Sequence, residues 1–587
     1  MTKIVTDILV VGGGTGATAA AIQAARRGVS TVIVGEYSWL GGMLTSAGVS
    51  APDGNELLAF ETGLWGQYLR SLQQRQSGGL DSAWVSLFTY DPPIGAKIFA
   101  DWVKELPNLT WISGQTPLAV LKQGNRITGV EFANLTVEAK ITLDGTELGD
   151  ILALAEVPHR WGWELQSDFN EPSAPTSFNR LTDTYPVQSP TWVVILQDYG
   201  ETEKAPEIPA PPIDHPNQFI GAWDGYGIEQ FLNYGRLPGD RFMINWPQNG
   251  NDYGKDLNRL ITSDTARQEF HQEALWHTQS FARFIQQELG DRYGLAPNIF
   301  PHSLGNGAYA LHPYYRESRR LQGQVTVTEQ HILPMPGGNV APLPFTPEGN
   351  VSAIAIGNYA NDHHYPGFNF SLKSKSLRWG GRWTGTPFSL PYDCLIPDST
   401  EGLLVCDKNI SVSHIANGAT RLQPIVMNLG QAAGMAAALC IELGYQPSEL
   451  PIRQLQEALL QDPLAPAAII PLFNLSPNHP DWLFWQRHFL NFPDTYPIGG
   501  NCPNLKPVSI PFATGNLYKG IFKRTGDREY SITLTSPIIQ QDQTWTLITR
   551  NPQVNQQLEI YPDTQVISLW GRCNHAGHWL IVEKILA

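Results

Sequence analysis

Cysteine and charge are both scarce in this chain of 587 residues. The five cysteines (Cys394, Cys406, Cys440, Cys502 and Cys573) form no CxxC pair, and an odd number spread over a long chain is a poor disulfide framework. Charged residues make up 16% of the chain against 42% hydrophobic residues, the opposite of the balance in a disordered polymer. We therefore expect a folded, cytoplasmic protein with reduced thiols.

Positive charge is the scarcer sign, with 39 Lys and Arg against 54 Asp and Glu and a net charge of −15. An acidic surface repels phosphate backbones, which argues against a nucleic-acid partner. The apolar runs are too short or too interrupted to cross a bilayer, and the polar start Met1-Thr2-Lys3 does not resemble a signal peptide. We expect a small-molecule substrate and no membrane segment, and the oligomeric state stays open.

A recognisable metal-ligand spacing is also missing. Cys573, His575 and His578 are close in the sequence, but their spacing matches no common zinc arrangement. A hairpin turn explains them better, so we expect no metal site.

Glycine is abundant, and its placement near the start of the chain is informative. Asp7–Val11 is an aliphatic run with the length of a buried parallel strand, and it stops at Gly12-Gly13-Gly14-Thr15-Gly16. An Ala-rich helical segment (17–27) and a second strand (30–34) follow. This order predicts a dinucleotide-binding βαβ unit, in which Gly12 permits the tight turn and Gly14 lets backbone approach a pyrophosphate.

The ribose end of this motif departs from the usual pattern. The acidic residue that normally closes the second strand would fall at Gly35, and Glu36 comes next. We predict that Glu36 reaches the ribose or that another group holds it.

A second small-residue loop, Trp39 to Gly48, follows the second strand. A domain that binds only a nicotinamide cofactor does not need such a loop, whereas the long flavin half of FAD must lie against exposed backbone. The predicted cofactor contacts here are Gly41, Gly42, Met43 and Thr45.

At this point the chain resembles the FAD-dependent oxidoreductases of the glutathione-reductase-like fold, in particular the xanthan-lyase-like branch. More distantly, it is similar to the flavoprotein subunits of fumarate reductase and succinate dehydrogenase. The resemblance spans roughly residues 5 to 445, and it implies FAD as the cofactor.

Two later patches carry the same resemblance. Gly145-Thr146-Glu147-Leu148-Gly149-Asp150 matches the turn that returns to the cofactor, and a preceding β-meander near Leu118 would contact adenine. A strand at 403–405, a loop from Cys406 to Thr420 and a helix from about 426 to 443 form the other patch. By resemblance, its cofactor contacts are Asn409, Gln431 and Ala432, besides Gly149 and Asp150 in the earlier patch.

The fold class that follows is α/β: a Rossmann-like FAD-binding domain with an inserted α+β substrate domain and a small C-terminal all-β module. We expect the FAD domain at 1–155 and 386–450, the insert at 156–385, a connector at 451–499 and the β module at 500–587. Within the insert, 263–289 lacks Pro and Gly and predicts one long helix.

Oxidation of a substrate by a flavin requires a polar group that holds the substrate and a proton acceptor near the flavin. By similarity to an Arg-Leu pair in fumarate-reductase-like proteins, Arg421 is the predicted substrate clamp, and His414 in the same predicted loop is the predicted base or hydrogen-bond partner. Asp362-His363-His364-Tyr365 supplies the other candidates, His363 and His364. For each histidine, a structural role stays open.

The best interpretation is an FAD-dependent dehydrogenase or oxidase that transfers a hydride from a small or medium organic substrate to flavin N5. An amine or amino-acid oxidase is one alternative. A non-catalytic flavin-binding or scaffold protein is an alternative of a different class.

Overall fold

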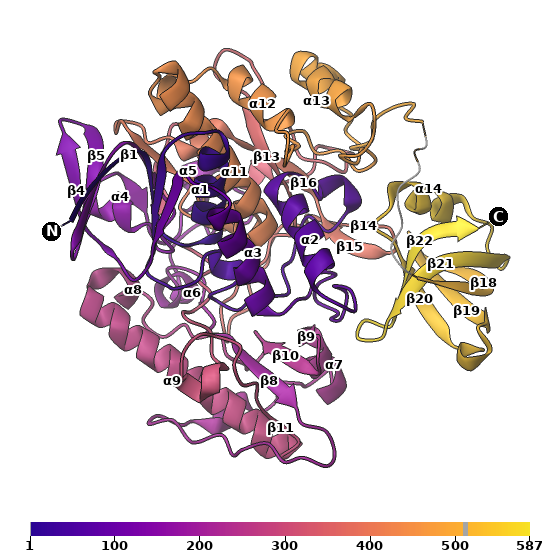
Figure 1. Ribbon diagram of the computed structural model, residues 1–587. Coiled ribbons are helices and arrows are strands. Elements are labelled where there is room, and N and C mark those ends of the chain that lie inside the picture. Colours follow the sequence, from indigo (N-terminus) through magenta and orange to yellow (C-terminus); the bar gives the residue numbers. More distant parts are fainter. Residues whose placement is uncertain (1, 507, 509–514, 587) are drawn as a thin grey trace.

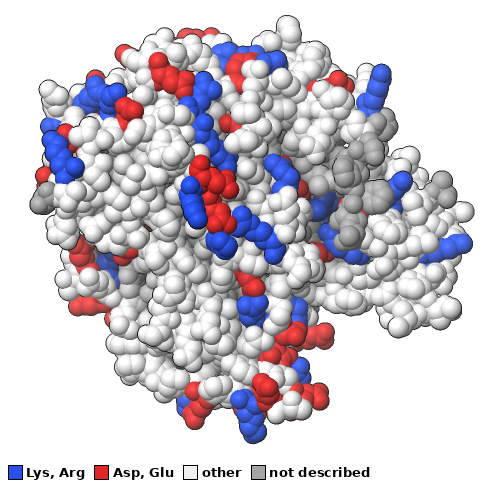
Figure 2. Space-filling model, in the orientation of Figure 1, with Lys and Arg blue, Asp and Glu red and all other residues white. Residues whose placement is uncertain are grey.

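The computed structural model describes residues 2–506, 508 and 515–586 (Figure 1). Residues 1, 507, 509–514 and 587, which fall in the predicted first and last units, lie outside the described residues. Charged groups of both signs are interspersed over the face shown in Figure 2, with wide uncharged areas between them.

A seven-stranded sheet forms the centre of the first unit. β1 (Thr2–Val11) leads through the glycine turn into α1 (Thr15–Arg26) and β2 (Thr31–Val34), so the predicted βαβ unit is confirmed. In the parallel part of the sheet, Val10 lies opposite Ile33 on one side and Leu143 on the other. The other strands are β3 (Leu109–Ile112), β4 (Pro117–Gln123), β5 (Arg126–Phe132), β6 (Leu135–Asp144) and β17 (Leu403–Val405). β4, β5 and β6 form the predicted antiparallel meander.

Helices α1 and α11 (Gln423–Leu443) cross at very close range. A Cβ added at Gly430 would lie 2.2 Å from the carbonyl oxygen of Gly16, and one at Gly434 would lie 2.2 Å from that of Ala20. The small residues of α11 therefore let two backbones meet. Within the described residues, α11 is the one helix long and apolar enough to cross a membrane, and 94% of that window is buried inside the protein, as in a core helix.

The remaining helices around the sheet are α2 (Gly63–Arg75), α3 (Pro92–Lys104), α4 (Asp150–Leu154), α10 (His414–Thr420), α12 (Ile452–Leu460) and α13 (Trp482–Asn491). The prediction of a loop from Cys406 to Thr420 is wrong at its end, because α10 occupies that part. The Ser413 hydroxyl accepts from the Ala416 N–H at 3.0 Å and caps α10, a signal that the sequence interpretation missed.

The inserted segment builds its own sheet and core. Strands β8 (Val194–Asp198), β9 (Arg236–Leu237), β10 (Arg241–Ile244) and β11 (Tyr293–Leu295) pair in the order β11-β8-β10-β9. The long helix α9 (Asp264–Leu289) packs beside them and confirms the predicted helix (Figure 1). Short elements complete the segment: α5 (Gln166–Phe169), α6 (Arg180–Thr184), α7 (Ile228–Tyr234), α8 (Arg259–Thr262), β7 (His159–Arg160), β12 (Arg320–Leu321), β14 (Ser376–Trp379) and β15 (Arg382–Gly385). Strand β13 (Ala353–Asn358) pairs with β16 (Pro387–Pro391), and both pack on the core of the first unit.

The C-terminal module is a closed barrel with a separate apolar core. Its strands are β18 (Asn516–Gly526), β19 (Glu529–Ser536), β20 (Thr544–Ile548), β21 (Val566–Asn574) and β22 (Trp579–Leu586), with helix α14 (Pro552–Ile560). The turn between β21 and β22 holds His575 and His578, which confirms the predicted hairpin. The fold class is therefore the one expected: a Rossmann-like α/β unit, an α+β insert and an all-β module.

Candidate functional site

A cavity of about 370 Å³ lies where β1, β2 and β6 end. The carboxyl ends of parallel strands are where open α/β sheets bind ligands. The first unit contributes Gly12, Gly13, Gly14, Val34, Gly35, Glu36, Tyr37, Ser46, Gln115, Thr116, Pro117, Leu118, Thr146, Glu147, Leu148, Asp150, Ala153 and Leu154. The insert contributes Ile261, Ser263, Asp264, Arg267, Gln268, His271, His312, Tyr315 and Arg319.

The glycine turn presents bare backbone to this cavity. Gly12 has φ +111°, and a Cβ there would lie 2.2 Å from the Gly145 carbonyl oxygen, so only glycine fits. Gly14 is the N-cap of α1, without a side-chain cap and without an acidic residue in the first turn. The Asp407 carboxylate takes one N–H of the first turn, that of Gly16, and the bare turn at residues 12–14 leaves the rest of the positive end of α1 to an anion in the cavity.

The loop at 41–46 packs directly on the glycine turn. The Gly41 N–H donates to the Gly13 carbonyl at 3.0 Å, and the Thr15 hydroxyl donates to the Gly41 carbonyl at 2.7 Å. The Thr45 hydroxyl donates to the Leu40 carbonyl at 2.6 Å. Gly41, Gly42, Met43 and Thr45 therefore shape the loop, and Ser46 is the residue of this loop that lines the cavity.

A buried charge cluster fixes the far side of the turn. The Gly16 N–H donates to Asp407 at 2.8 Å, and the Lys408 ammonium lies 2.9 Å from Asp407 and 2.6 Å from Glu147. Burial alone would lower the pKa of Lys408, but these two carboxylates raise it, so the lysine stays charged. The predicted cofactor contact Asn409 donates to the Asp144 carbonyl at 3.1 Å and so helps to hold this cluster in place.

Two arginines hold the predicted contact Asp150. Arg267 of α9 donates to both of its carboxylate oxygens at 2.8 and 3.2 Å, and Arg319 donates at 3.1 Å. Gly149, with φ +66°, turns the chain into α4 directly before Asp150. The three charges add up to +1 on the cavity wall.

Aromatic and imidazole rings form the rest of the insert's wall. Tyr37 stacks on His312 with ring centroids 4.4 Å apart, and His312 Nε2 lies 2.9 Å from the Ser46 hydroxyl. His271 hydrogen-bonds the Tyr315 hydroxyl. Burial lowers the pKa of both His271 and His312 to about 4, so both rings are neutral near pH 7.

The shape and chemistry of the cavity fit a dinucleotide. The uncapped helix and side-chain-free turn suit a pyrophosphate, the solvent-exposed Glu36 lies where a ribose would sit, and Leu118 (54% exposed) offers an apolar surface for a base. The two predicted contacts on α11, Gln431 and Ala432, are fully buried and do not line this cavity. The Gln431 side chain accepts from the Leu64 N–H and donates to the Ala465 carbonyl, both at 2.8 Å.

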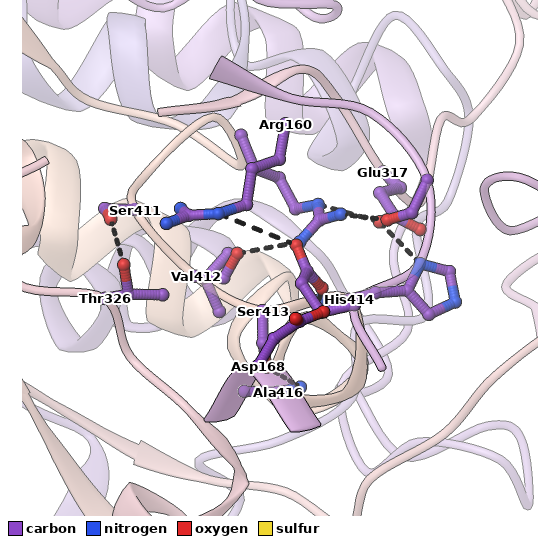
Figure 3. Close-up of polar contacts among 12 residues, drawn as sticks. Arg160, Asp168, Glu317, Thr326, Ser411, Val412, Ser413, His414 and Ala416 are labelled. Atoms are coloured by element: carbon purple, nitrogen blue, oxygen red, sulfur yellow. Dashed lines mark hydrogen bonds and ion pairs between the residues drawn. The ribbon is translucent and has the colours of Figure 1, made fainter. Parts of the chain in front are cut away.

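A second group of polar side chains lies buried beyond the cavity wall. His414 Nδ1 is 2.8 Å from the Glu317 carboxylate (Figure 3), and its Nε2 is 2.5 Å from the Tyr365 hydroxyl. The same hydroxyl lies 2.7 Å from His363. The structure thus brings the predicted residues His414 and His363 together through Tyr365.

Arg421 and His364 meet in the adjoining part of this group. Arg421 donates to the Tyr314 hydroxyl at 2.6 Å and lies 3.3 Å from Asp362. His364 bridges Asp362 at 2.9 Å and Asp252 at 2.7 Å. All four predicted catalytic residues therefore belong to one network.

The segment 314–320 separates the network from the cavity and takes part in both. Tyr315 and Arg319 line the cavity, whereas Tyr314 bonds Arg421 and Glu317 bonds His414. The sequence interpretation missed Glu317, Tyr365, Arg267, His271, His312 and Tyr315. The available signals were the Arg-rich stretch at 316–320 and the tyrosine beside the paired histidines.

The network contains polar atoms without a partner. Arg421 is 2% exposed, and its Nε has no hydrogen-bond acceptor among the described residues. The amide of Asn361 and the Oδ1 of Asn417 are likewise unsatisfied within the described part of the chain. Buried polar atoms normally find partners, so this region is suited to a polar ligand.

The sequence profile of a family described as FAD dependent oxidoreductase matches residues 7–459. Among curated proteins, no sequence matches the chain.

Similar solved structures include L-proline dehydrogenase from P. horikoshii, at 15% identity and TM-score 0.23, covering 34% of this chain and 62% of that one. This chain thus aligns with less than two thirds of that enzyme's length. A geranylgeranyl bacteriochlorophyll reductase-like protein from Thermoplasma acidophilum aligns at 10% identity and TM-score 0.31, over 78% of this chain and 84% of that one. The p-nitrophenol 4-monooxygenase of Pseudomonas putida aligns at 12% identity and TM-score 0.24, over 34% and 50%.

Proposed function

The chain belongs to the FAD-dependent oxidoreductase family, and from this premise we propose that it is a dehydrogenase or oxidase acting on a small or medium-sized organic substrate. Bound FAD supplies the hydride acceptor, its N5 atom. The protein must bind both partners, exclude water and take up the accompanying proton.

The cofactor cavity offers a distinct group for each part of FAD. Gly12, Gly13 and Gly14 with the start of α1 would hold the pyrophosphate, and Glu36 a ribose hydroxyl. Leu118 would contact the adenine. The flavin would then extend toward Ser46 and His312, where the loop after β2 meets the insert.

The observation that carries the proposal is the buried guanidinium of Arg421 with its unpartnered Nε. Two of its nitrogens are held by Tyr314 and Asp362, so the group is fixed in orientation and still has a donor to offer. A fixed, desolvated guanidinium is a strong binding site for a carboxylate. Only the segment 314–320 separates Arg421 from the cofactor cavity, and a substrate clamp must lie close to the cofactor.

His414 can relay a proton within this network. Burial and the nearby Arg320 keep the pKa of His414 well below its ordinary value, so the imidazole is neutral. Burial raises the pKa of Glu317 to about 7. The Glu317, His414 and Tyr365 chain can therefore hold or pass a proton near neutral pH.

The test is anaerobic bleaching of the bound flavin by defined metabolite pools. We expect a single class of organic compound to bleach it, and the active pool can be fractionated to identify that class. Bleaching by amines or amino acids alone would favour the oxidase alternative. If no pool bleaches a correctly loaded protein, the proposed reaction is wrong.

We predict that Arg421→Ala keeps its FAD and is reduced roughly ten- to a hundred-fold more slowly by the substrate, because a charge-assisted contact contributes about 1.5–3 kcal/mol. Stopped-flow absorbance measures the rate, and Arg421→Lys, which keeps the charge but loses the fork, should fall between the two. Unchanged reduction kinetics in the Ala variant would remove Arg421 from the substrate site.

A further inference from the structure

A second cavity, of about 220 Å³, lies next to the Arg421 network. Four separate segments form it: the loop that follows the cofactor-binding stretch, the loop at Val85, the end of β13, and the hairpin β14–β15. Its lining residues are Asp53, Gly54, Glu56, Val85, Asn358, Tyr359, Ala360, Ser376, Arg382, Trp383, Thr384 and Gly385.

Asp53 is the carboxylate that stands out on this cavity wall. It is partly buried, and it has no hydrogen-bond or ion-pair partner among the described residues. The neighbouring charges are paired, since Glu56 lies 3.2 Å from Arg382 and Asp362 lies 3.3 Å from Arg421. Asp53 is therefore free to act on a ligand.

The cavity wall continues into the substrate clamp. Tyr359 and Ala360 line the cavity, and the chain goes directly on to Asn361, whose amide is unsatisfied, and Asp362, which holds Arg421. A Cβ on Gly54 would lie 3.7 Å from Leu422, the residue after Arg421. Asp53 therefore lies in the cavity wall, and the buried Arg421, with its unpartnered Nε, lies directly behind that wall.

The same loop also connects the two cavities. Ser46 lines the cofactor cavity and Asp53 lines the second one, with six residues of chain between them. The Ser50 hydroxyl between them is buried without a partner among the described atoms. A substrate in the second cavity would therefore lie beside the loop that borders the cofactor.

We infer that Asp53 is the catalytic base, and that the substrate is an acid with a hydroxyl or amino group on the carbon to be oxidised. The inference rests on the proposed function. Arg421 would hold the carboxylate of the substrate. Bound FAD would supply the hydride acceptor for the C–H electron pair, and the Asp53 carboxylate would take the O–H or N–H proton, which leaves a C=O or C=N bond in the product.

Charge around Asp53 sets the pH at which it can act. Burial, then Glu56 and Asp362, raise its pKa to about 8 against the opposing pull of Arg382 and Arg421. The other ionisable groups facing it, Tyr234 and Tyr359, have pKa values raised well above their ordinary range and stay neutral. Since a base must be ionised, the rate of flavin reduction should rise with pH through about 8.

His414 is not the catalytic base in this arrangement. It is fully buried, and both of its ring nitrogens are already bonded, to Glu317 and to Tyr365, so neither nitrogen is left for a substrate. It acts as a positioning residue behind the site.

The experiment uses the FAD-loaded full-length protein under anaerobic stopped flow. Hydroxy acids and amino acids are compared with the alcohols and amines that lack the carboxylate. We expect only the acids to bleach the flavin, with a rate constant that rises about tenfold per pH unit below about pH 8 in the wild type. Asp53→Asn should lower the rate at least about a hundred-fold and remove this pH dependence, with unchanged FAD content. Asp53→Glu should restore part of the rate, and the exposed Asp398→Asn is the matched control.

The outcomes separate the two proposals. If nothing bleaches the wild type, the proposed function fails, and this inference fails with it. If acids bleach the wild type and Asp53→Asn at equal rates, only the assignment of Asp53 is overturned. A flat pH profile in the wild type would overturn it without any variant, and bleaching only by compounds without a carboxylate would overturn the substrate class.

Discussion

At the residue scale, Arg267 is the side chain with the most informative position. It belongs to the insert, yet it lines the cofactor cavity and is held by Asp150 of the first unit. We predict that Arg267 also binds the pyrophosphate, so that Arg267→Ala raises the dissociation constant of FAD about ten- to a hundred-fold through loss of this charge-assisted contact. Fluorescence titration of the apoprotein with FAD measures this, and titration with ADP tests the same half of the cofactor.

Two further variants distinguish phosphate binding from simple bracing of α9. Arg283→Ala removes an arginine from the same helix that pairs with Glu207 at the surface, and it should bind FAD normally. Asp150→Asn breaks the ion pair but leaves Arg267 in the cavity. If Arg267 only braces the helix, Asp150→Asn will weaken FAD binding as much as Arg267→Ala does.

At the scale of elements, the sequence predicted what local patterns determine. The β1–α1–β2 unit and α9 follow from hydrophobic period and turn residues and were found within a few residues, and the all-β character of the C-terminal module was predicted as well. Contacts between distant segments left no such pattern. No local sequence pattern indicates that Glu317 contacts His414, 97 residues away. The contact between Arg267 and Asp150, which are 117 residues apart, is equally invisible in the sequence.

The small residues of α11 show how one pattern can serve two purposes. Gln431 and Ala432 of this helix were predicted cofactor contacts by resemblance, whereas its Gly430 and Gly434 provide the close contact with α1. Gly434→Val should therefore destabilise the fold by on the order of 3 kcal/mol, since its side chain would collide with the backbone of Ala20. Urea denaturation measures this, with the volume-conserving Met435→Leu as control. A variant that keeps its stability but loses FAD would instead assign these residues to the cofactor.

At the scale of the whole molecule, the barrel is a closed sheet with its own core that also makes ion pairs and apolar contacts with the first unit. It lies at one side of the molecule beside the β14–β15 hairpin (Figure 1). Arg550 lies 2.5 Å from Glu61 and Arg572 lies 2.6 Å from Asp81, both carboxylates of the first unit. Leu87 packs with Ile548 and Ile581 in a small apolar cluster across the same contact.

We predict that a chain truncated after Gly499 still binds FAD, because every residue that lines the cofactor cavity precedes it in the sequence. The same chain should melt at a lower temperature and self-associate, since Leu87 would be exposed and Glu61 and Asp81 would lose their cations. Thermal denaturation and size-exclusion chromatography at several concentrations check this. Ile581→Asp in the full-length chain is the matched variant, because it disturbs the contact and keeps the barrel sequence. Full stability of the truncated chain would mean that the docking contributes little, and loss of FAD would mean that the barrel and the cofactor unit fold as one.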